Sequence, residues 1–172
     1  MGILLLIPFF LIRFGLLAVL NKDAVRRAAR FAPMERRELP AYWAYQLSNA
    51  AILLSLFFLT PQTAPPALFW AGAAVYGLGT IVLATAMVNF AAPAADGMNK
   101  RGLYRVSRNP MYLAYFLFFL GCALLTQSPV LFGFVLVFQI SAHWIILAEE
   151  RWCIQAFGQA YLDYMHNVRR YL

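Results

Sequence analysis

Five apolar stretches, each close to the length of a membrane-crossing helix, make up most of this 172-residue chain. A helix crosses the hydrocarbon layer with about 20 mostly apolar residues, within a range of about 17–25. Hydrophobic residues form 63% of the chain and charged residues 12%, which leaves too little polar surface to cover a water-soluble fold. The sequence therefore predicts an all-α integral membrane protein with five transmembrane helices, at Ile3–Leu20, Tyr42–Leu59, Ala67–Phe90, Met111–Thr126 and Val130–Ala148.

The basic residues indicate how these helices cross the bilayer. Lys and Arg concentrate between the first and second stretches, between the third and fourth, and after the fifth, whereas the connections Thr60–Pro66 and Thr126–Pro129 carry no charge. Since Lys and Arg concentrate on the cytoplasmic side of membrane proteins, we expect the N-terminus outside and the C-terminus in the cytosol. Anionic lipid at the cytoplasmic leaflet then explains the net charge of +7, and no nucleic-acid partner is needed.

The segment Gly102–Tyr112 places arginines and tyrosines at the cytosolic edge of the fourth predicted helix. Pro93 and Gly97 break the helix upstream, so we expect irregular backbone there, of the kind that lines a cavity. Asn109-Pro110 sets the first turn of the fourth helix, and the free N–H groups of that turn favour an anionic or acceptor group. An ordinary helix start with membrane-edge arginines and tyrosines is the alternative interpretation.

The fifth predicted helix carries polar residues on one face. Gln139, His143 and Glu150 are spaced by four and seven residues, so they share a side that should face the bundle interior. This pattern predicts a substrate-binding role for Gln139 and His143, with a hydrogen-bonded packing role as the alternative for His143. The carboxylates of Glu149 and Glu150 either pair with the arginines of the preceding loop or hold a cationic or hydroxyl-rich ligand.

The residues after Gly158 have the pattern of a surface helix. Tyr161, Tyr164, Met165 and Val168 are spaced by three and four residues, which predicts a C-terminal amphipathic tail helix on the membrane, acting as a lid or as an anchor. The two cysteines suggest neither a disulfide framework nor a metal cluster, so we expect no metal site.

Taken together, these stretches resemble the isoprenylcysteine carboxyl methyltransferase family, within a wider group that includes phospholipid N-methyltransferases. The family pattern is Gly-x-Tyr, Arg-His-Pro-x-Tyr, a helical hairpin, Glu-Glu, Phe-Gly and spaced tyrosines. Its counterparts here are Gly102, Tyr104, Arg108, Pro110, Tyr112, Glu149, Glu150, Phe157, Gly158, Tyr161 and Tyr164. The resemblance covers about the last half of the chain. The size of the chain indicates one membrane domain, residues 1–172. We expect an N-terminal two-helix part at 1–66, and the resemblance implies a cofactor-binding core at 67–172.

The resemblance implies a membrane-embedded methyltransferase that uses S-adenosyl-L-methionine. The acceptor would be a lipophilic small molecule or lipid that arrives from the bilayer and offers a carboxylate, thiol or amine. Arg108 and Glu150 are the predicted catalytic residues, with Arg108 orienting an anionic nucleophile. The implied cofactor ligands are Asn89, Gly97, Met98, Asn99, Tyr104, Asn109, Pro110, Met111, Tyr112 and Glu149.

Two positions depart from the family pattern. Asn109 replaces the usual histidine but keeps hydrogen-bonding ability, and Ile145 stands where the eukaryotic enzymes carry an arginine that helps recognise prenylcysteine. Two other functions remain as alternatives: an NADPH-dependent, sterol-reductase-like membrane reductase and a non-catalytic membrane scaffold. A short chain without long loops favours a prokaryotic inner membrane, with the site facing the cytosol.

Overall fold

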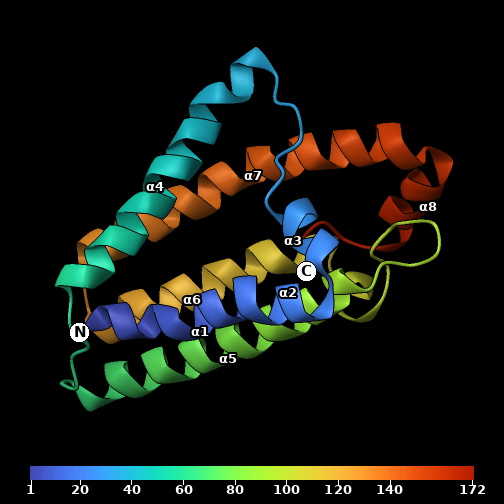
Figure 1. Cartoon of the computed structure of the whole chain (residues 1–172). Helices are drawn as coiled ribbons and strands as arrows, with labels where there is room; N and C mark the ends of the chain where they lie inside the picture. The colour runs from blue at the N-terminus through green and yellow to red at the C-terminus, as the bar shows by residue number, and fades with distance from the viewer.

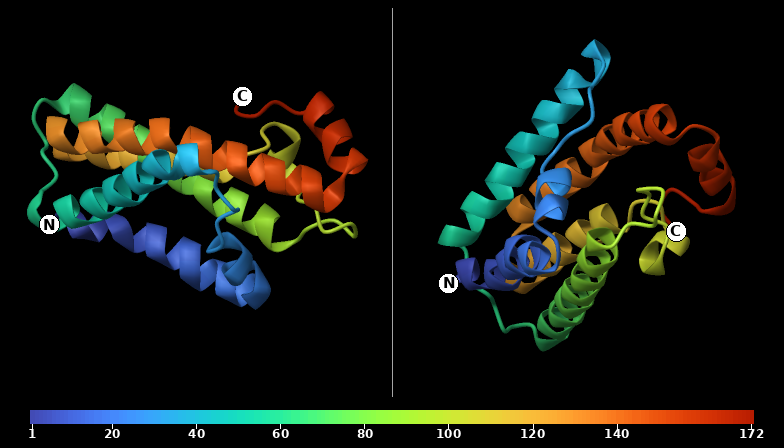
Figure 2. Two further views of the ribbon diagram at one scale, coloured as in Figure 1. Left: turned by 90° about the horizontal axis from the view of Figure 1, so that it is seen from above. Right: turned by 45° about the vertical axis from the view of Figure 1, so that its right-hand side comes forward.

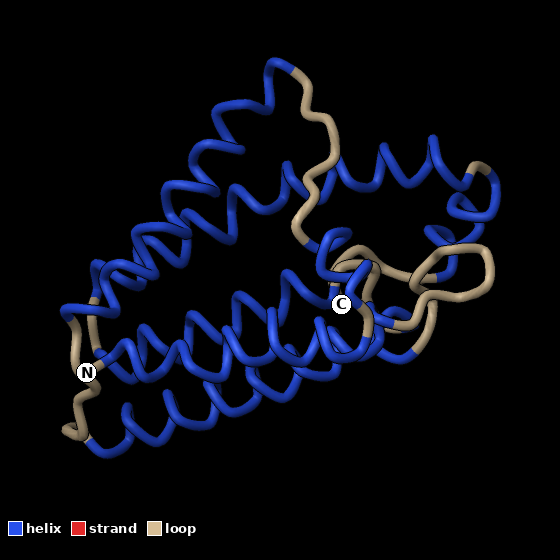
Figure 3. The backbone as a smooth tube through the Cα atoms, viewed as in Figure 1, coloured by secondary structure: helices blue, strands red, loops and turns tan.

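The computed structural model describes residues 1–172 and contains helices and loops but no strand (Figure 3). A first helical stretch, Gly2–Leu20, includes α1 (Ile7–Phe10), a π-helical part (Leu11–Leu16) and α2 (Leu17–Leu20). The other helices, labelled in Figure 1, are α3 (Lys22–Ala28), α4 (Leu39–Phe58), α5 (Pro66–Ala91), α6 (Pro110–Thr126), α7 (Pro129–Phe157) and α8 (Gln159–Asn167).

Three of these helices are long and apolar enough to cross a membrane: Gly2–Leu20, α5 and α7. Helix α6 is apolar but has 17 residues, one turn fewer than an average span. Helix α4 has 20 residues but is more polar, because its middle carries Gln46, Ser48 and Asn49. The all-helical class and a bilayer environment are therefore confirmed. Of the five expected membrane spans, three have the length and composition that a span requires.

Prolines and short polar caps explain where the helices begin. Pro66, Pro110 and Pro129 each occupy the first position of α5, α6 and α7, where the missing N–H would have no partner in any case. The Ser128 side chain accepts the N–H of Leu131 and so caps α7. Only two residues separate α6 from α7, which produces the tight hairpin that the sequence predicts.

The charged and uncharged connections lie at opposite ends of the bundle (Figures 1 and 2). At the uncharged end, the Gly2 N–H donates to Leu59 O at 2.7 Å, and the Gln62 N–H donates to Leu125 O at 2.8 Å. The opposite end gathers α3, the loop 92–109, α8 and the C-terminus. This separation matches the charge pattern on which the predicted orientation rests.

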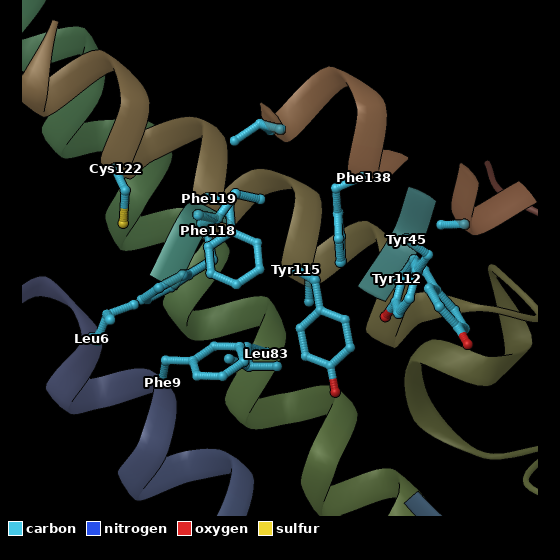
Figure 4. Packing of buried hydrophobic residues seen from close by; sticks show 14 of the residues in the cluster. Leu6, Phe9, Tyr45, Leu83, Tyr112, Tyr115, Phe118, Phe119, Cys122 and Phe138 are labelled. Atoms are coloured by element: carbon cyan, nitrogen blue, oxygen red, sulfur yellow. The ribbon is translucent and has the colours of Figure 1, made fainter. Parts of the chain in front are cut away.

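Aromatic rings fill the interior between the first helix, α6 and α7. The Phe9 ring centroid lies 5.5 Å from that of Phe118 and 5.3 Å from that of Phe119, as Figure 4 displays. Farther along, Tyr45 of α4 stacks on Phe138 of α7 at 4.7 Å. These contacts join the N-terminal helices to the last three, so the two parts of the chain form one packed unit.

An ion pair holds the start of α4 against α7. The carboxylate of Glu38, 5% exposed, accepts from both terminal nitrogens of Arg151, at 2.8 and 2.5 Å. The hydrogen bond from Arg151 lowers the pKa of Glu38, so the carboxylate stays ionised at neutral pH. The basic linker before Glu38 is thereby held at the charged end of the bundle.

Helices α5 and α6 approach each other closely through glycines. A Cβ on Gly79 would lie 2.5 Å from the backbone nitrogen of Phe118, and a Cβ on Gly121 would lie 2.5 Å from the backbone of Tyr76. A Cβ on Gly77, in contrast, would meet nothing within 4 Å. The close contact therefore involves the face of α5 that carries Gly79 and not the position of Gly77.

We expect Gly79→Ala to lower the free energy of unfolding by about 1–3 kcal/mol, the usual cost of overpacking a tight interface. The new methyl group would press on the Phe118 backbone, which has little freedom to move within α6. Thermal unfolding in detergent measures the effect, and Gly77→Ala in the same helix is the matched control. Equal melting temperatures for the two variants would contradict this packing assignment.

Candidate active site

A cavity of about 330 Å³ opens at the charged end of the bundle, and hydrophobic side chains form 15 of its 24 lining residues. The wall is built by the N-terminal helix and linker on one side and by the loop 92–109, α6, α7 and α8 on the other. Pockets of this size and mixed polarity are typical of small-molecule sites.

The loop between α5 and α6 contributes Gly97, Met98 and Asn99 to the wall. Gly97 has φ +83°, which a residue with a side chain rarely adopts. The Asp96 carboxylate accepts from the Met98 N–H at 3.1 Å and from Lys100 Nζ at 2.5 Å. These bonds close a compact turn that presents Met98 and Asn99 to the cavity.

Asn89, at the end of α5, supports the next part of the wall without lining the cavity. Its Oδ1 accepts the Leu103 N–H at 2.8 Å. Gly102 has φ +57°, and a Cβ there would lie 2.1 Å from that oxygen, so this contact requires glycine. The bond fixes the turn that carries Tyr104 into the wall.

Two tyrosines face each other across the loop and α8. The Tyr164 hydroxyl donates to Tyr104 O at 2.6 Å, while the Tyr104 hydroxyl is buried without a partner in the protein. Burial raises the pKa of Tyr164 to about 12 and that of Tyr104 well above its ordinary value. Both hydroxyls therefore stay protonated at neutral pH, and that of Tyr104 is free to bond a ligand.

Glu150 is the centre of a buried ionic cluster. One carboxylate oxygen contacts Arg108 at 2.9 and 3.0 Å, and the other contacts Arg170 at 2.8 and 2.9 Å. Arg108 also donates to the backbone carbonyls of Met165 and Val168. The cluster thus attaches the C-terminal tail to the start of α6 and the end of α7.

The tail also pairs with the chain just before α6. Ser107 and Arg169 form a parallel bridge, and the Arg108 N–H donates to Arg169 O at 2.9 Å. The Asn109 amide donates to Arg170 O at 3.2 Å. The two sequence motifs, whose nearest residues Tyr112 and Glu149 are 37 positions apart, therefore meet in space.

Glu149 points to the cavity beside the first turn of α6. The Tyr112 hydroxyl donates to its carboxylate at 2.8 Å, and both residues line the cavity. No basic side chain lies within ion-pairing distance of Glu149. Glu150 is therefore ion-paired inside the protein, whereas Glu149 lines the cavity without an ion-pair partner.

Residues 67–160 match the sequence profile of a family described as phospholipid methyltransferase. The chain belongs to this family. No curated protein and no solved structure shows a significant match. The matched segment runs from α5 to the first residues of α8 and contains the loop, the start of α6 and both carboxylates. Membership of the phospholipid methyltransferase family implies a membrane methyltransferase, and that family in general uses S-adenosylmethionine.

Most of the site residues that the sequence predicts for this member of the phospholipid methyltransferase family lie together at the cavity. Arg108 and Glu150 lie in its wall, as do eight of the ten expected cofactor ligands. Pro110 is buried and, like Asn89, lies outside the lining. The eight lining residues are Gly97, Met98, Asn99, Tyr104, Asn109, Met111, Tyr112 and Glu149.

Gln139 and His143, the expected substrate-binding residues, lie outside the cavity. The His143 Nδ1 lies 2.6 Å from the Tyr171 hydroxyl, so this histidine contacts the C-terminal tail. The Gln139 Oε1 is buried without a partner. At His143, therefore, the C-terminal tail and not the cavity meets this side of α7.

Sequence reasoning missed the contribution of the N-terminal part. Arg13, Arg27, Arg30, Tyr45 and, from α6, Tyr115 also line the cavity. Only Arg13 gave a signal, because a charged residue in the middle of an apolar span is costly and tends to face the protein interior. The residues beside Arg13 in the cavity wall lie far from it in the sequence and belong to no recognisable sequence motif.

Proposed function

We propose that this protein is a membrane methyltransferase that transfers a methyl group from S-adenosylmethionine to a lipophilic small molecule or lipid. The observation that carries the proposal is the position of the cavity. Most of its lining residues belong to the segment that matches the phospholipid methyltransferase family, and eight of them are residues expected to bind the cofactor.

The polar groups of the wall fit this cofactor. S-adenosylmethionine carries an amino group, a sulfonium, ribose hydroxyls and an adenine ring. Glu149 offers an unpaired carboxylate to the cationic groups, and the unpartnered Asn99 Oδ1 and Tyr104 hydroxyl offer an acceptor and a donor. The flat faces of Tyr104 and Tyr112 suit a heteroaromatic ring. When bound, the cofactor would supply an activated methyl group that needs no metal.

The residues of this chain would hold the reacting groups in position and keep water away from them. Alignment of two reacting groups in a closed site can lower a barrier by several kcal/mol, and the largely apolar lining excludes water from the reacting atoms. The contacts of Arg108 and Glu150 favour a role different from the catalytic one that the sequence suggested. Because each bonds the other and the tail, we propose that they position Asn109 and α8 around the cofactor.

We further propose that all five apolar helices cross the bilayer, with the cavity facing the cytosol. The basic loops surround the cavity end, and S-adenosylmethionine is made in the cytosol. A bacterial inner membrane fits the short loops. The acceptor would then enter sideways from the lipid.

Calorimetric titration of S-adenosylmethionine into the detergent-purified protein tests the proposal, with NADPH titrated in a parallel cell. Saturable binding of S-adenosylmethionine alone is the expected result. Binding of NADPH alone would transfer the assignment to a reductase. If a well-folded sample binds neither cofactor, the methyltransferase proposal fails and a scaffold role takes its place.

A further inference from the structure

Resting on the proposed function, we propose that Arg13 and Tyr115 form a subsite for an anionic head group of the lipophilic acceptor. Arg13 comes from the first helical stretch and Tyr115 from α6, and both line the cavity. Arg13 lies outside the segment that matches the phospholipid methyltransferase family. The subsite therefore joins one residue from outside the matched segment to one, Tyr115, inside it.

The Arg13 guanidinium is only partly satisfied. Its Nη2 donates to Ala28 O at 2.6 Å, and its Cζ lies 5.6 Å from the centroid of the Tyr115 ring. Its Nη1 is buried and has no partner in the protein. A charge inside a membrane helix is costly and is normally paired, so the free nitrogen marks a place for an anion.

The Tyr115 hydroxyl provides a second donor beside this guanidinium. Tyr115 is 7% exposed, and its hydroxyl also lacks a partner. Four of the five buried side-chain atoms without a partner belong to lining residues of this one cavity: Arg13, Asn99, Tyr104 and Tyr115. Buried polar groups are almost always hydrogen-bonded, so their concentration at one place indicates a ligand.

The local backbone supports a functional role for Arg13. Residues Leu11–Leu16 form a π-helical stretch inside the first helix, with Arg13 at its centre. Such stretches are rare and occur frequently at functional sites. The wider turn changes the direction of the side chains that follow it. Here it contains Arg13, the one charged residue of Gly2–Leu20.

The charges of the wall favour an anion once the cofactor is bound, although Arg27 and Arg30 are exposed to solvent. Arg108 and Glu150 compensate each other through their ion pair. Arg13, Arg27 and Arg30 then stand against the single carboxylate of Glu149. S-adenosylmethionine itself carries a net positive charge at neutral pH, so it makes this excess larger. An acceptor with a carboxylate or phosphate head group restores the balance, whereas an acceptor with a cationic head group would increase the repulsion.

The alkyl chain of such an acceptor has apolar surface available beside the subsite. Phe31, Met111 and Trp152 belong to the same lining. An amphiphile would therefore place its head group at Arg13 and its chain along these side chains. Neither contact needs the cofactor, so the subsite is open to test by binding alone.

The test compares three probes with the same alkyl chain: hexadecanoate, hexadecanol and hexadecylamine. Each is titrated into protein in nanodiscs of neutral lipid, with empty nanodiscs as the blank. Binding is followed by the change in tryptophan emission, to which Trp152 in the lining contributes. Hexadecanoate is expected to bind roughly ten-fold or more tightly than the other two, as a charge-assisted hydrogen bond provides. Equal affinities, or a preference for hexadecylamine, would overturn the proposal.

Arg13→Gln should remove the preference for hexadecanoate, and Arg13→Lys should keep part of it. Tyr115→Phe, which deletes only the hydroxyl, should reduce it several-fold. The matched control is Arg26→Gln, because Arg26 is an exposed arginine of α3 that does not line the cavity. An unchanged preference in Arg13→Gln would contradict the assignment.

Titration of S-adenosylmethionine into the same variants separates this inference from the proposed function. Arg13→Gln should bind the cofactor as the unmodified protein does. If it loses the cofactor but keeps the preference for hexadecanoate, Arg13 serves the cofactor carboxylate and the acceptor subsite is refuted. If the unmodified protein prefers hexadecanoate but does not bind the cofactor, the proposed function fails while the anion subsite stands.

Discussion

Glu149→Gln should weaken the binding of S-adenosylmethionine by roughly 10–100-fold, as expected for the loss of a charged partner in a buried site. The carboxylate is the one acidic group of the cavity that no basic side chain neutralises. Glutamine keeps the shape and still accepts the hydrogen bond from Tyr112, so the melting temperature should change little. Calorimetric titration gives the affinity, and thermal unfolding gives the stability.

Tyr112→Phe is the control for this prediction. It removes the hydroxyl that donates to Glu149 at 2.8 Å but leaves the carboxylate charge in place, so it should weaken binding less than Glu149→Gln does. Unchanged cofactor affinity in Glu149→Gln, with an intact fold, would remove Glu149 from the cofactor site.

Glu150→Gln, one residue farther along α7, should have the opposite profile and lower the free energy of unfolding by about 3–5 kcal/mol. The side chains of Glu150 and Arg108 are 4% and 7% exposed, and breaking a buried ion pair leaves an uncompensated charge. Here two arginines, Arg108 and Arg170, would lose their common partner. Thermal unfolding in detergent measures the loss.

The same substitution should loosen the C-terminal tail. The tail is attached through Glu150, Arg108 and the Ser107–Arg169 bridge, so hydrogen exchange at residues 168–172 should increase. Asp163→Asn is the control, because this carboxylate is exposed and contacts only neighbouring residues of α8. A melting temperature as high as that of the control would show that the cluster contributes little.

Local sequence signals predicted much of the fold. The apolar stretches, the prolines at 66, 110 and 129 and the short 127–128 connection lead to the observed helices and hairpin. These features depend on backbone chemistry within a few residues, where periodicity and proline geometry are decisive. Helix α4 departs from the expectation because its polar residues dilute the apolar signal that defines a span.

The site was predictable where its residues form a compact motif and unpredictable where they do not. Tyr104, Tyr112 and Glu149 were found because their order and spacing carry a family pattern, and all three line the cavity. Gln139 and His143 have the right spacing for a shared face, but a helical period does not say which neighbour covers that face. In this fold the C-terminal tail reaches His143 through Tyr171.

The sequence alone determined the helical class, the membrane environment and the motif that identifies the phospholipid methyltransferase family, because each of these follows from composition or from residues close in the chain. The tertiary structure decided which charges are satisfied. Glu149 and Glu150 are adjacent and chemically identical, yet only Glu150 faces Arg108 and Arg170. Arg13 enters the same cavity because the first helix packs against α6 through Phe9 and Phe118. Contacts between residues so far apart depend on the packing of whole helices, which no local pattern specifies.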